Sequence, residues 1–339
     1  MIRKNKFINK CSTLVLIIGI CLFLIPAHIN AQTIMDTSVT YVHSQKPSFK
    51  AKFIQNLSSV FGVKKIIEKS ITKNKIKQDA APVPKSFVKK YVVIQDTVMN
   101  RDVWTITSKE SSSDKIVIYL HGGAYYWNIS KYNWSITEQL VDKTKATFII
   151  PDYPLAPKAN CEEVYEFISE LYVKTQVQHP NKKIIIMGES AGGGLALGFA
   201  MWLREHEKIQ PEQLILLAPW LDVTMANPNL SEIDKNDKIL GIKGLQLAGN
   251  GYAGNLSTKD YRVSPIYGNL NDLAKISIFV GAHDLFCADS RLLKDKMRKN
   301  NTVFNYFEYP KMFHVWILVK KLKEANVAIE QIVNLITKK

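Results

Sequence analysis

Short apolar runs alternate with helical patterns through most of the chain. The runs are rich in β-branched and aromatic residues and are typical of buried strands at 116–120, 147–150, 183–187, 214–217, 276–280 and 304–308. Apolar residues recur at helical spacing over 131–145, 161–177, 191–207, 288–299 and 315–337. Because continuous apolar strands with helical crossovers are covered on both sides, the pattern predicts an α/β fold. Its mostly parallel central sheet would carry helices on both faces.

Three further segments of the chain have other patterns. Apolar runs at 91–94 and 103–106, joined by a turn, predict an antiparallel hairpin at the start of the sheet. A lysine-rich segment, 32–85, precedes them and has apolar residues at the spacing of amphipathic helices. A polar segment at about 222–260 interrupts the rhythm, at a place above the carboxyl ends of the strands where ligands bind in such sheets. We predict a main domain over 86–339 that carries this insertion.

The N-terminus has the pattern of an export signal. Four basic residues, Arg3, Lys4, Lys6 and Lys10, precede an apolar run over 14–27. The run is shorter than the about 20 residues of a comfortable membrane span, but it suits the core of a signal peptide. Small residues at Ala27 and Ala31 offer cleavage points. We predict that residues 1–31 are a signal peptide or an uncleaved anchor. The protein would then be exported, either extracellular or membrane-anchored on the outer face.

The formal net charge of +15 is concentrated in one part of the chain. Residues 46–90 contain twelve lysines against two acidic residues, Glu68 and Asp79. Aromatic residues are not interleaved with these lysines as in RNA-binding segments, and no nucleic-acid motif is present, so nucleic acid is not an expected partner. Two interpretations remain open: a solvated face in a lysine-rich protein, or a weak association with an anionic envelope surface.

The cysteines do not form a scaffold or a metal site. Cys11 and Cys21 fall in the predicted export segment, which leaves Cys161 and Cys287. No CxxC pair and no His/Cys cluster has the spacing of zinc ligands, so no metal is predicted. We expect two free, buried thiols in preference to a disulfide.

The motif at residues 188–192 carries the most specific chemical signal. Ser190 lies at its centre, directly after a predicted strand and directly before a predicted helix. So sharp a turn requires glycine two residues to either side, here Gly188 and Gly192, and it leaves the serine hydroxyl exposed above the sheet. The helix N-terminus beneath the serine also favours developing negative charge. We predict Ser190 to be a nucleophile.

A second motif, at residues 121–124, ends the predicted strand 116–120. A tetrahedral intermediate needs backbone N–H groups aimed at its oxyanion, and glycine permits that close approach. Gly122 and Gly123 are therefore the predicted donors, together with the N–H of Ala191, the residue after the nucleophile. We expect His121 to anchor this loop and not to carry a proton.

A serine nucleophile needs a base, and the base needs a carboxylate to orient it. In enzymes with this turn the chain order is serine, then acid, then histidine. Asp284 lies just beyond the predicted strand 276–280, and His314 lies just beyond the last predicted strand. Both would reach the same rim of the sheet as Ser190, so we predict Asp284 as the acid and His314 as the base.

In combination these motifs resemble one family, the hormone-sensitive-lipase-like branch of the α/β-hydrolases, which includes bacterial esterases and lipases. The shared features, in family order, are His121–Ala124, Asp152–Pro157, Gly188–Gly193, Ser264-Pro265, Asp284 and His314. The resemblance implies an α/β-hydrolase core, a cap formed by the helices of 32–85 plus the insertion at 222–260, and no cofactor. It implies the same roles for Ser190, Asp284, His314 and the three oxyanion donors. Ala124 stands where many members have a third glycine.

These observations predict a secreted serine hydrolase that cleaves carboxylic esters through an acyl-enzyme. Its substrate would be a small-molecule ester with a short acyl or acetyl group. The aromatic residues after the second motif either line an acyl or sugar pocket or serve as packing; they are Tyr125, Tyr126 and Trp127. Two alternatives stay open: an amidase or carbohydrate deacetylase on the same fold, and a non-catalytic binding protein. The sequence does not indicate the oligomeric state.

Overall fold

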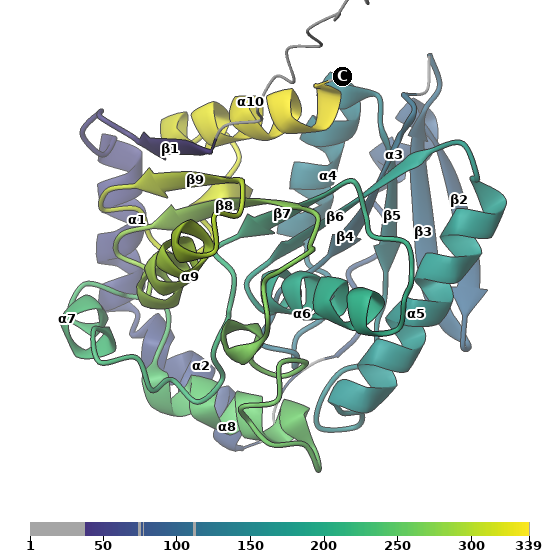
Figure 1. Ribbon diagram of the computed structural model, residues 1–339. Coiled ribbons are helices and arrows are strands. Elements are labelled where there is room, and N and C mark those ends of the chain that lie inside the picture. The colour runs from purple at the N-terminus through teal and green to yellow at the C-terminus, as the bar shows by residue number, and fades with distance from the viewer. Residues whose placement is uncertain (1–37, 74–75, 77, 111–112, 339) are drawn as a thin grey trace, which may run out of the picture. The chain divides into compact units, whose positions relative to one another are not determined.

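Residues 38–73, 76, 78–110 and 113–338 are described by a computed structural model of the protein (Figure 1). They lie in the second of two units into which the chain divides, Thr37–Lys339. The predicted export segment 1–31 lies outside the described residues, so export stays a prediction.

Within the described residues, nine strands form one sheet in the order β1-β9-β8-β7-β6-β4-β5-β3-β2. Their bounds are β1 (Val39–Val42), β2 (Tyr91–Val98), β3 (Arg101–Ser108), β4 (Lys115–Leu120), β5 (Thr147–Pro151), β6 (Lys183–Glu189), β7 (Gln213–Leu217), β8 (Lys275–Gly281) and β9 (Phe304–Tyr309). β3 pairs antiparallel with both β2 and β5, and the other neighbours pair in parallel. The predicted α/β fold class with its antiparallel hairpin is confirmed.

The helices cover both faces of this sheet (Figure 1). Their bounds are α3 (Lys85–Lys90), α4 (Lys131–Thr144), α5 (Cys161–Gln178), α6 (Ala191–Glu205), α9 (Cys287–Lys299) and α10 (Lys323–Thr337). Alternate residues of a strand point to opposite faces, and β4 shows the consequence. Ile116, Ile118 and Leu120 join the apolar core beneath α5, α6 and α9, while Val117 and Tyr119 join the core beneath α4 and α10. Burial on both faces explains why the strands read as unbroken apolar runs.

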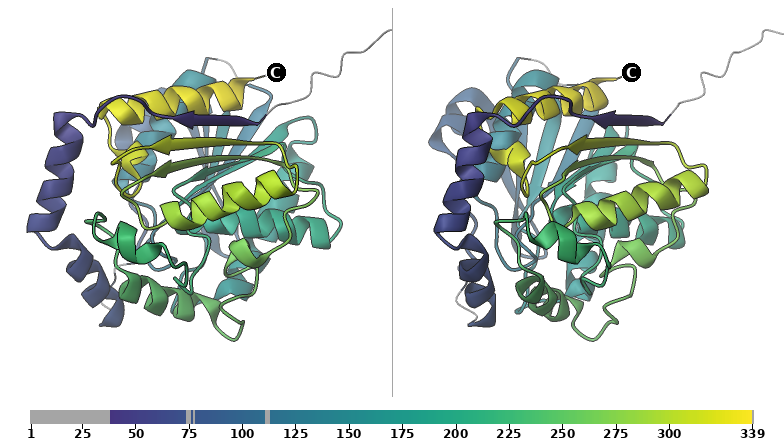
Figure 2. Two further views of the ribbon diagram at one scale, coloured as in Figure 1. Left: turned by 60° about the vertical axis from the view of Figure 1, so that its left-hand side comes forward. Right: turned by 90° about the vertical axis from the view of Figure 1, so that its left-hand side faces the viewer.

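Four helices lie outside this layered core. They are α1 (Phe49–Val60), α2 (Val63–Thr72), α7 (Leu230–Asp234) and α8 (Ile242–Ala253). α2 packs against α8 (Figure 2). A Lys64–Asp234 ion pair of 2.5 Å links α2 to α7. The two segments that the resemblance assigns to a cap are therefore in contact, although the division into cap and main domain stays a prediction. No helix in the described part of the chain combines the length and apolar content that a bilayer span requires.

Two elements differ from the sequence prediction. The predicted helix at 315–337 is wrong in its first part, because a short 3-10 turn, η2 (Trp316–Leu318), precedes α10, which begins at Lys323. Val315 and Lys321 both adopt positive φ, 48° and 65°, and a continuous α-helix cannot pass through such residues. The edge strand β1, which extends the sheet beyond β9, was not predicted.

Cys161 and Cys287 are free and buried, as predicted. Each is the first residue of a helix, α5 and α9 respectively. Burial raises the pKa of the Cys161 thiol to about 12 and raises the pKa of the Cys287 thiol further. Both thiols are therefore protonated at neutral pH and poor nucleophiles.

Candidate active site

Ser190 occupies the turn between β6 and α6 with φ 55° and ψ −120°, a backbone conformation that few non-glycine residues adopt. The two flanking glycines make that turn fit. A Cβ on Gly188 would lie 2.2 Å from the carbonyl oxygen of Gly192, and a Cβ on Gly192 would lie 2.0 Å from the carbonyl oxygen of Leu120. The Ser190 N–H donates to the carbonyl of Leu217 at 2.9 Å, which ties the turn to β7. The sharp turn predicted from the motif is present.

The structure brings together the three residues predicted to form the triad. His314 Nε2 lies 3.0 Å from Ser190 Oγ, and His314 Nδ1 lies 2.8 Å from Asp284 Oδ2. All three side chains are buried. Asp284 follows β8 and His314 follows β9, so parallel strands deliver both residues to the rim that holds Ser190. Because a carboxylate only accepts hydrogen bonds, Nδ1 carries the imidazole proton and Nε2 is left to accept one from the serine.

The electrostatics around His314 favour its charged form. Burial lowers the pKa of His314, but the carboxylate of Asp284 outweighs that effect, with smaller contributions from Asp237 and Glu189, so the pKa lies above its usual value. An imidazole that takes the proton of Ser190 would therefore be stabilised as imidazolium.

Asp237 is a site residue that the sequence analysis missed. It lies in the 222–260 insertion and accepts hydrogen bonds from the N–H groups of Ile239 at 2.7 Å and Leu240 at 2.8 Å. Its other oxygen accepts from the N–H of Leu285 at 2.9 Å, next to the triad acid. Burial and the nearby Asp284 raise the pKa of Asp237 to about 6. No motif or spacing marks this residue, because its contacts arise only when the insertion folds over β8.

The loop after β4 holds two of the three predicted oxyanion donors, Gly122 and Gly123. The N–H of Gly122 donates to Glu189 Oε1 in this structure, so its role as an oxyanion donor stays a prediction. Gly123 adopts φ 114°, and a Cβ there would lie 2.3 Å from the carbonyl oxygen of Trp127. Ala191 is the first residue of α6, where the N–H has no partner within the helix. Gly123 and Ala191 therefore remain as candidate donors, and Ala124 lines the pocket beside them.

Glu189 and His121 hold this loop in place. Glu189 Oε1 also accepts from Asn133 Nδ2 at 2.7 Å, and burial raises the pKa of Glu189 to about 7. The His121 ring stacks on Tyr153 at 4.3 Å between centroids, and its Nδ1 lies 2.7 Å from the Gly122 carbonyl oxygen. Burial lowers the pKa of His121 to about 4, so the ring is neutral. Both residues contact the loop backbone, which fits the anchoring role expected for His121.

A pocket of about 270 Å³ opens at Ser190 and His314. Its apolar wall combines Ile67 of α2 with Leu240 and Leu245 of the insertion. The segments predicted to form a cap thus contribute directly to the space in front of Ser190.

The three aromatic residues after the oxyanion loop have different places. Trp127 lines the pocket at Ser190. Tyr125 is fully buried and stacks on Tyr252 at 3.5 Å between ring centroids, so it belongs to the core. Tyr126 is also buried, and its hydroxyl would lie 2.1 Å from a Cβ placed on Gly251 of α8. The pocket-lining prediction therefore fits Trp127, while the packing interpretation fits Tyr125 and Tyr126.

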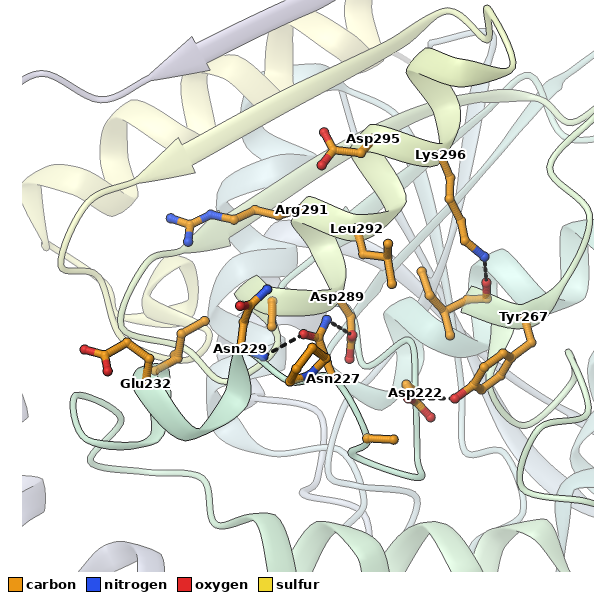
Figure 3. A pocket seen from close by; sticks show the side chains of 15 residues that line it. Asp222, Asn227, Asn229, Glu232, Tyr267, Asp289, Arg291, Leu292, Asp295 and Lys296 are labelled. Carbon is orange, nitrogen blue, oxygen red and sulfur yellow. Dashed lines mark hydrogen bonds between the residues drawn. The ribbon is translucent and has the colours of Figure 1, made fainter.

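A larger pocket of about 530 Å³ lies away from the triad, between α7 and α9 (Figure 3). Asp289 reaches into it from α9 and accepts from Asn227 Nδ2 at 2.7 Å. Burial raises the pKa of Asp289 to about 6. No residue of the triad lines this space. In the described part of the chain, no group of three or more His, Cys, Asp or Glu side chains is arranged to hold a metal ion.

Comparison with known proteins agrees with this geometry. Residues 117–318 match the model of the alpha/beta hydrolase fold family. The chain belongs to that family. The match begins in β4, just before the oxyanion loop, and ends shortly after His314, so it spans all three triad positions.

Relatives of this alpha/beta hydrolase are esterases and lipases. An esterase of Acinetobacter venetianus is 29% identical over 227 residues, which cover 65% of this chain and 75% of that protein. An acetyl-hydrolase of Streptomyces hygroscopicus is 25% identical over 203 residues, 60% of this chain and 68% of that protein. A solved hormone-sensitive lipase from a metagenome library shares the fold with a TM-score of 0.72, at 20% identity over 86% of this chain and 99% of that one. The family predicted from the motifs is confirmed. The predicted class of enzyme, a carboxylic ester hydrolase, is confirmed as well.

Proposed function

We propose that the protein is a serine esterase that hydrolyses short-chain carboxylic esters through an acyl-enzyme on Ser190. The observation that carries the proposal is the buried chain of hydrogen bonds from Ser190 to His314 to Asp284, of 3.0 and 2.8 Å, at the base of an apolar pocket. Membership of the alpha/beta hydrolase family and the names of the relatives support it.

In the first half-reaction, His314 Nε2 takes the hydroxyl proton as Ser190 Oγ attacks the ester carbonyl carbon. The carbonyl oxygen becomes an oxyanion, which the N–H groups of Gly123 and Ala191 receive. His314 then gives its proton to the departing alcohol, and the acyl group remains on Ser190. Water then attacks the acyl carbon as His314 takes its proton, and His314 returns that proton to Ser190 Oγ as the bond to the acyl group breaks and the acid leaves. Asp284 holds the imidazole in the reactive tautomer and stabilises the imidazolium.

The Ser190→Ala variant tests this function. It should lose hydrolysis of p-nitrophenyl acetate by about 10⁵-fold or more, because no other group supplies the nucleophile. Ser169→Ala, on α5 and remote from the pocket, should keep the wild-type rate. Hydrolysis by Ser190→Ala within tenfold of the wild type would contradict the proposal.

The names of the relatives also bear on the acyl group. One relative is an acetyl-hydrolase, and the small pocket at Ser190 favours a short acyl chain. Acetylated carbohydrates are the alternative substrate class. Turnover of p-nitrophenyl acetate far above that of acetylated sugars, at equal concentration, would favour simple esters, and the reverse would favour a carbohydrate deacetylase.

We also propose that the protein is exported, on the basis of the basic residues and apolar run at 1–31. Expression in a bacterial host followed by fractionation tests this directly. The protein should leave the cytoplasm, with a mature N-terminus after Ala27 or Ala31 if the segment is cleaved. Retention of the intact chain in the cytoplasmic fraction would contradict export.

A further inference from the structure

The outer face of α1 is apolar, which inverts the usual arrangement of a surface helix. Phe49, Phe53, Leu57 and Val60 recur at helical spacing and are exposed to 84, 54, 41 and 80% respectively. Phe61, directly after the helix, is 65% exposed. We call these five residues the α1 apolar face. Large apolar side chains at such exposure in one row mark an interaction surface.

The opposite, inner face of α1 holds the helix to the body of the protein. Ala51 is fully buried there. Gln55 Nε2 donates to the carbonyl of Lys311 at 3.0 Å, and Gln55 Oε1 lies 3.1 Å from His283 Nδ1. Ser48, which caps the helix, donates from Oγ to Glu324 Oε2 at 3.0 Å. Because small and polar residues fix this orientation, the apolar face points outward, and Figure 2 shows α1 and α2 along the outside of the structure.

Exposed lysines precede the α1 apolar face in the chain, lie on α1 itself and follow on α2. Lys46, Lys50, Lys52, Lys65 and Lys69 are all exposed. Among the described residues, none of these five forms an ion pair, and the stretch 46–73 contains one acidic residue, Glu68. Exposed aromatic and aliphatic side chains beside lysines that form no ion pair are the features of helices that lie in the interface of an anionic membrane. One of these lysines, Lys50, donates to the carbonyl of Lys320 at 3.1 Å.

We propose that the α1 apolar face docks on the surface of an anionic lipid bilayer, with Phe49, Phe53 and Val60 inserted among the headgroups and the lysines against lipid phosphates. Charge complementarity argues for this occupant over two others. A second copy of the protein would bring like-charged lysines together. The chain's own N-terminal segment would also bring like charges together, because it carries the basic residues Arg3, Lys4, Lys6 and Lys10. The proposal goes beyond the esterase function and does not depend on it.

Docking in this way would bring the pocket close to the lipid. Ile66 of α2, next to the α1 apolar face in sequence, is 56% exposed, while its neighbour Ile67 lines the pocket at Ser190. One short helix therefore presents one residue to the outside and the next to the nucleophile.

A tryptophan probe in the full chain tests the contact. Because the chain has six tryptophans of its own, the signal is the emission of the Phe53→Trp variant minus that of the parent chain. Added vesicles of phosphatidylglycerol and phosphatidylcholine should shift this difference emission to the blue, and brominated acyl chains should quench it. The matched control is Val177→Trp on α5, where valine is 75% exposed outside the proposed surface, and its emission should not respond. This comparison isolates α1 from any binding by residues 1–31, and it can be made in the Ser190→Ala background.

Co-sedimentation provides the second measurement. Phe53→Ser combined with Val60→Ser should weaken binding to the anionic vesicles about tenfold or more, since both side chains lose apolar area that the bilayer would bury. Val177→Ser combined with Ile209→Ser removes comparably exposed apolar residues elsewhere and should bind like the wild type. Binding should weaken with added salt and be weaker on phosphatidylcholine alone.

Several outcomes would overturn the proposal. The first is that the protein does not bind the anionic vesicles. The second is that brominated lipids quench the probes at positions 53 and 177 equally, and the third is that the two double variants lose binding equally. A blue-shifted emission at position 53 without vesicles would show that the chain itself covers the face. A blue shift that grows with protein concentration would show that a second copy covers it.

Discussion

Glu189, the residue before Ser190, has a buried carboxyl group that holds the loop after β4 in place. Oε1 accepts from the N–H of Gly122 and from Asn133 Nδ2. Burial makes the ionised form costly, so the pKa of Glu189 rises to about 7. The folded protein therefore holds a proton on Glu189 over a pH range in which the unfolded chain has already released it.

This difference predicts a pH-dependent stability. Between pH 4.5, the ordinary pKa, and about 7, the folded state binds more protons at Glu189, so the free energy of unfolding falls as pH rises. Glu189→Gln cannot ionise, and its stability relative to the wild type should rise across that range by up to about 3 kcal/mol. Urea unfolding of both proteins at several pH values measures the difference. Glu166→Gln, exposed on α5, is the control, and parallel curves for wild type and Glu189→Gln would contradict the account.

At the scale of elements, the strands were predictable because both of their faces are buried, which leaves an unbroken apolar run in the sequence. β1 was not, because its four residues pack only at the sheet edge and are mostly exposed. The start of α10 was not, because Val315 and Lys321 adopt positive φ without a glycine or proline to signal it. In the candidate site, Ser190, Asp284 and His314 were predictable because each follows the carboxyl end of a strand. The Gly122 contact depends on a carboxylate 67 residues away and has no local signature.

The close approach of α6 to β4 gives an element-scale prediction. Gly192→Ala would place a methyl group 2.0 Å from the Leu120 carbonyl oxygen and 2.5 Å from that of His121. Because both atoms are backbone, the helix must move away from the strand, and the free energy of unfolding should fall by about 3 kcal/mol or more. Gly241→Ala meets only the flexible Lys64 side chain, at 3.1 Å, and should change stability little. Equal stability of the two variants in urea unfolding would contradict this packing.

At the scale of the whole molecule, the pocket depends on segments far apart in the chain. Ile67 comes from the N-terminal helices, Leu245 from the insertion, and Trp127 from the loop after β4. The central sheet places the triad, while these outer segments limit the space in front of it to about 270 Å³. The family fold therefore accounts for the chemistry, and the segments around the pocket would select the acyl group.

Because the outer segments limit the pocket to about 270 Å³, we predict a preference for short acyl groups. Specificity constants for p-nitrophenyl esters should be similar for acetyl and butyryl groups and at least about tenfold lower for octanoyl. Leu245→Ala should raise the octanoyl-to-butyryl ratio by enlarging the pocket. The control is Leu247→Ala on the same helix, where the side chain is 39% exposed, and it should leave the ratio unchanged. An unchanged ratio in Leu245→Ala would show that α8 does not limit the acyl chain.

The central claim is that Ser190, activated by His314, is the nucleophile of an esterase. Reaction with a fluorophosphonate followed by mass spectrometry of the digested protein tests it most directly. We predict a phosphonyl adduct on the peptide that contains Ser190, formed at least about 10³-fold more slowly in His314→Ala because the serine then lacks its base. An adduct on a different residue, or a folded wild-type protein that remains unlabelled, would contradict it.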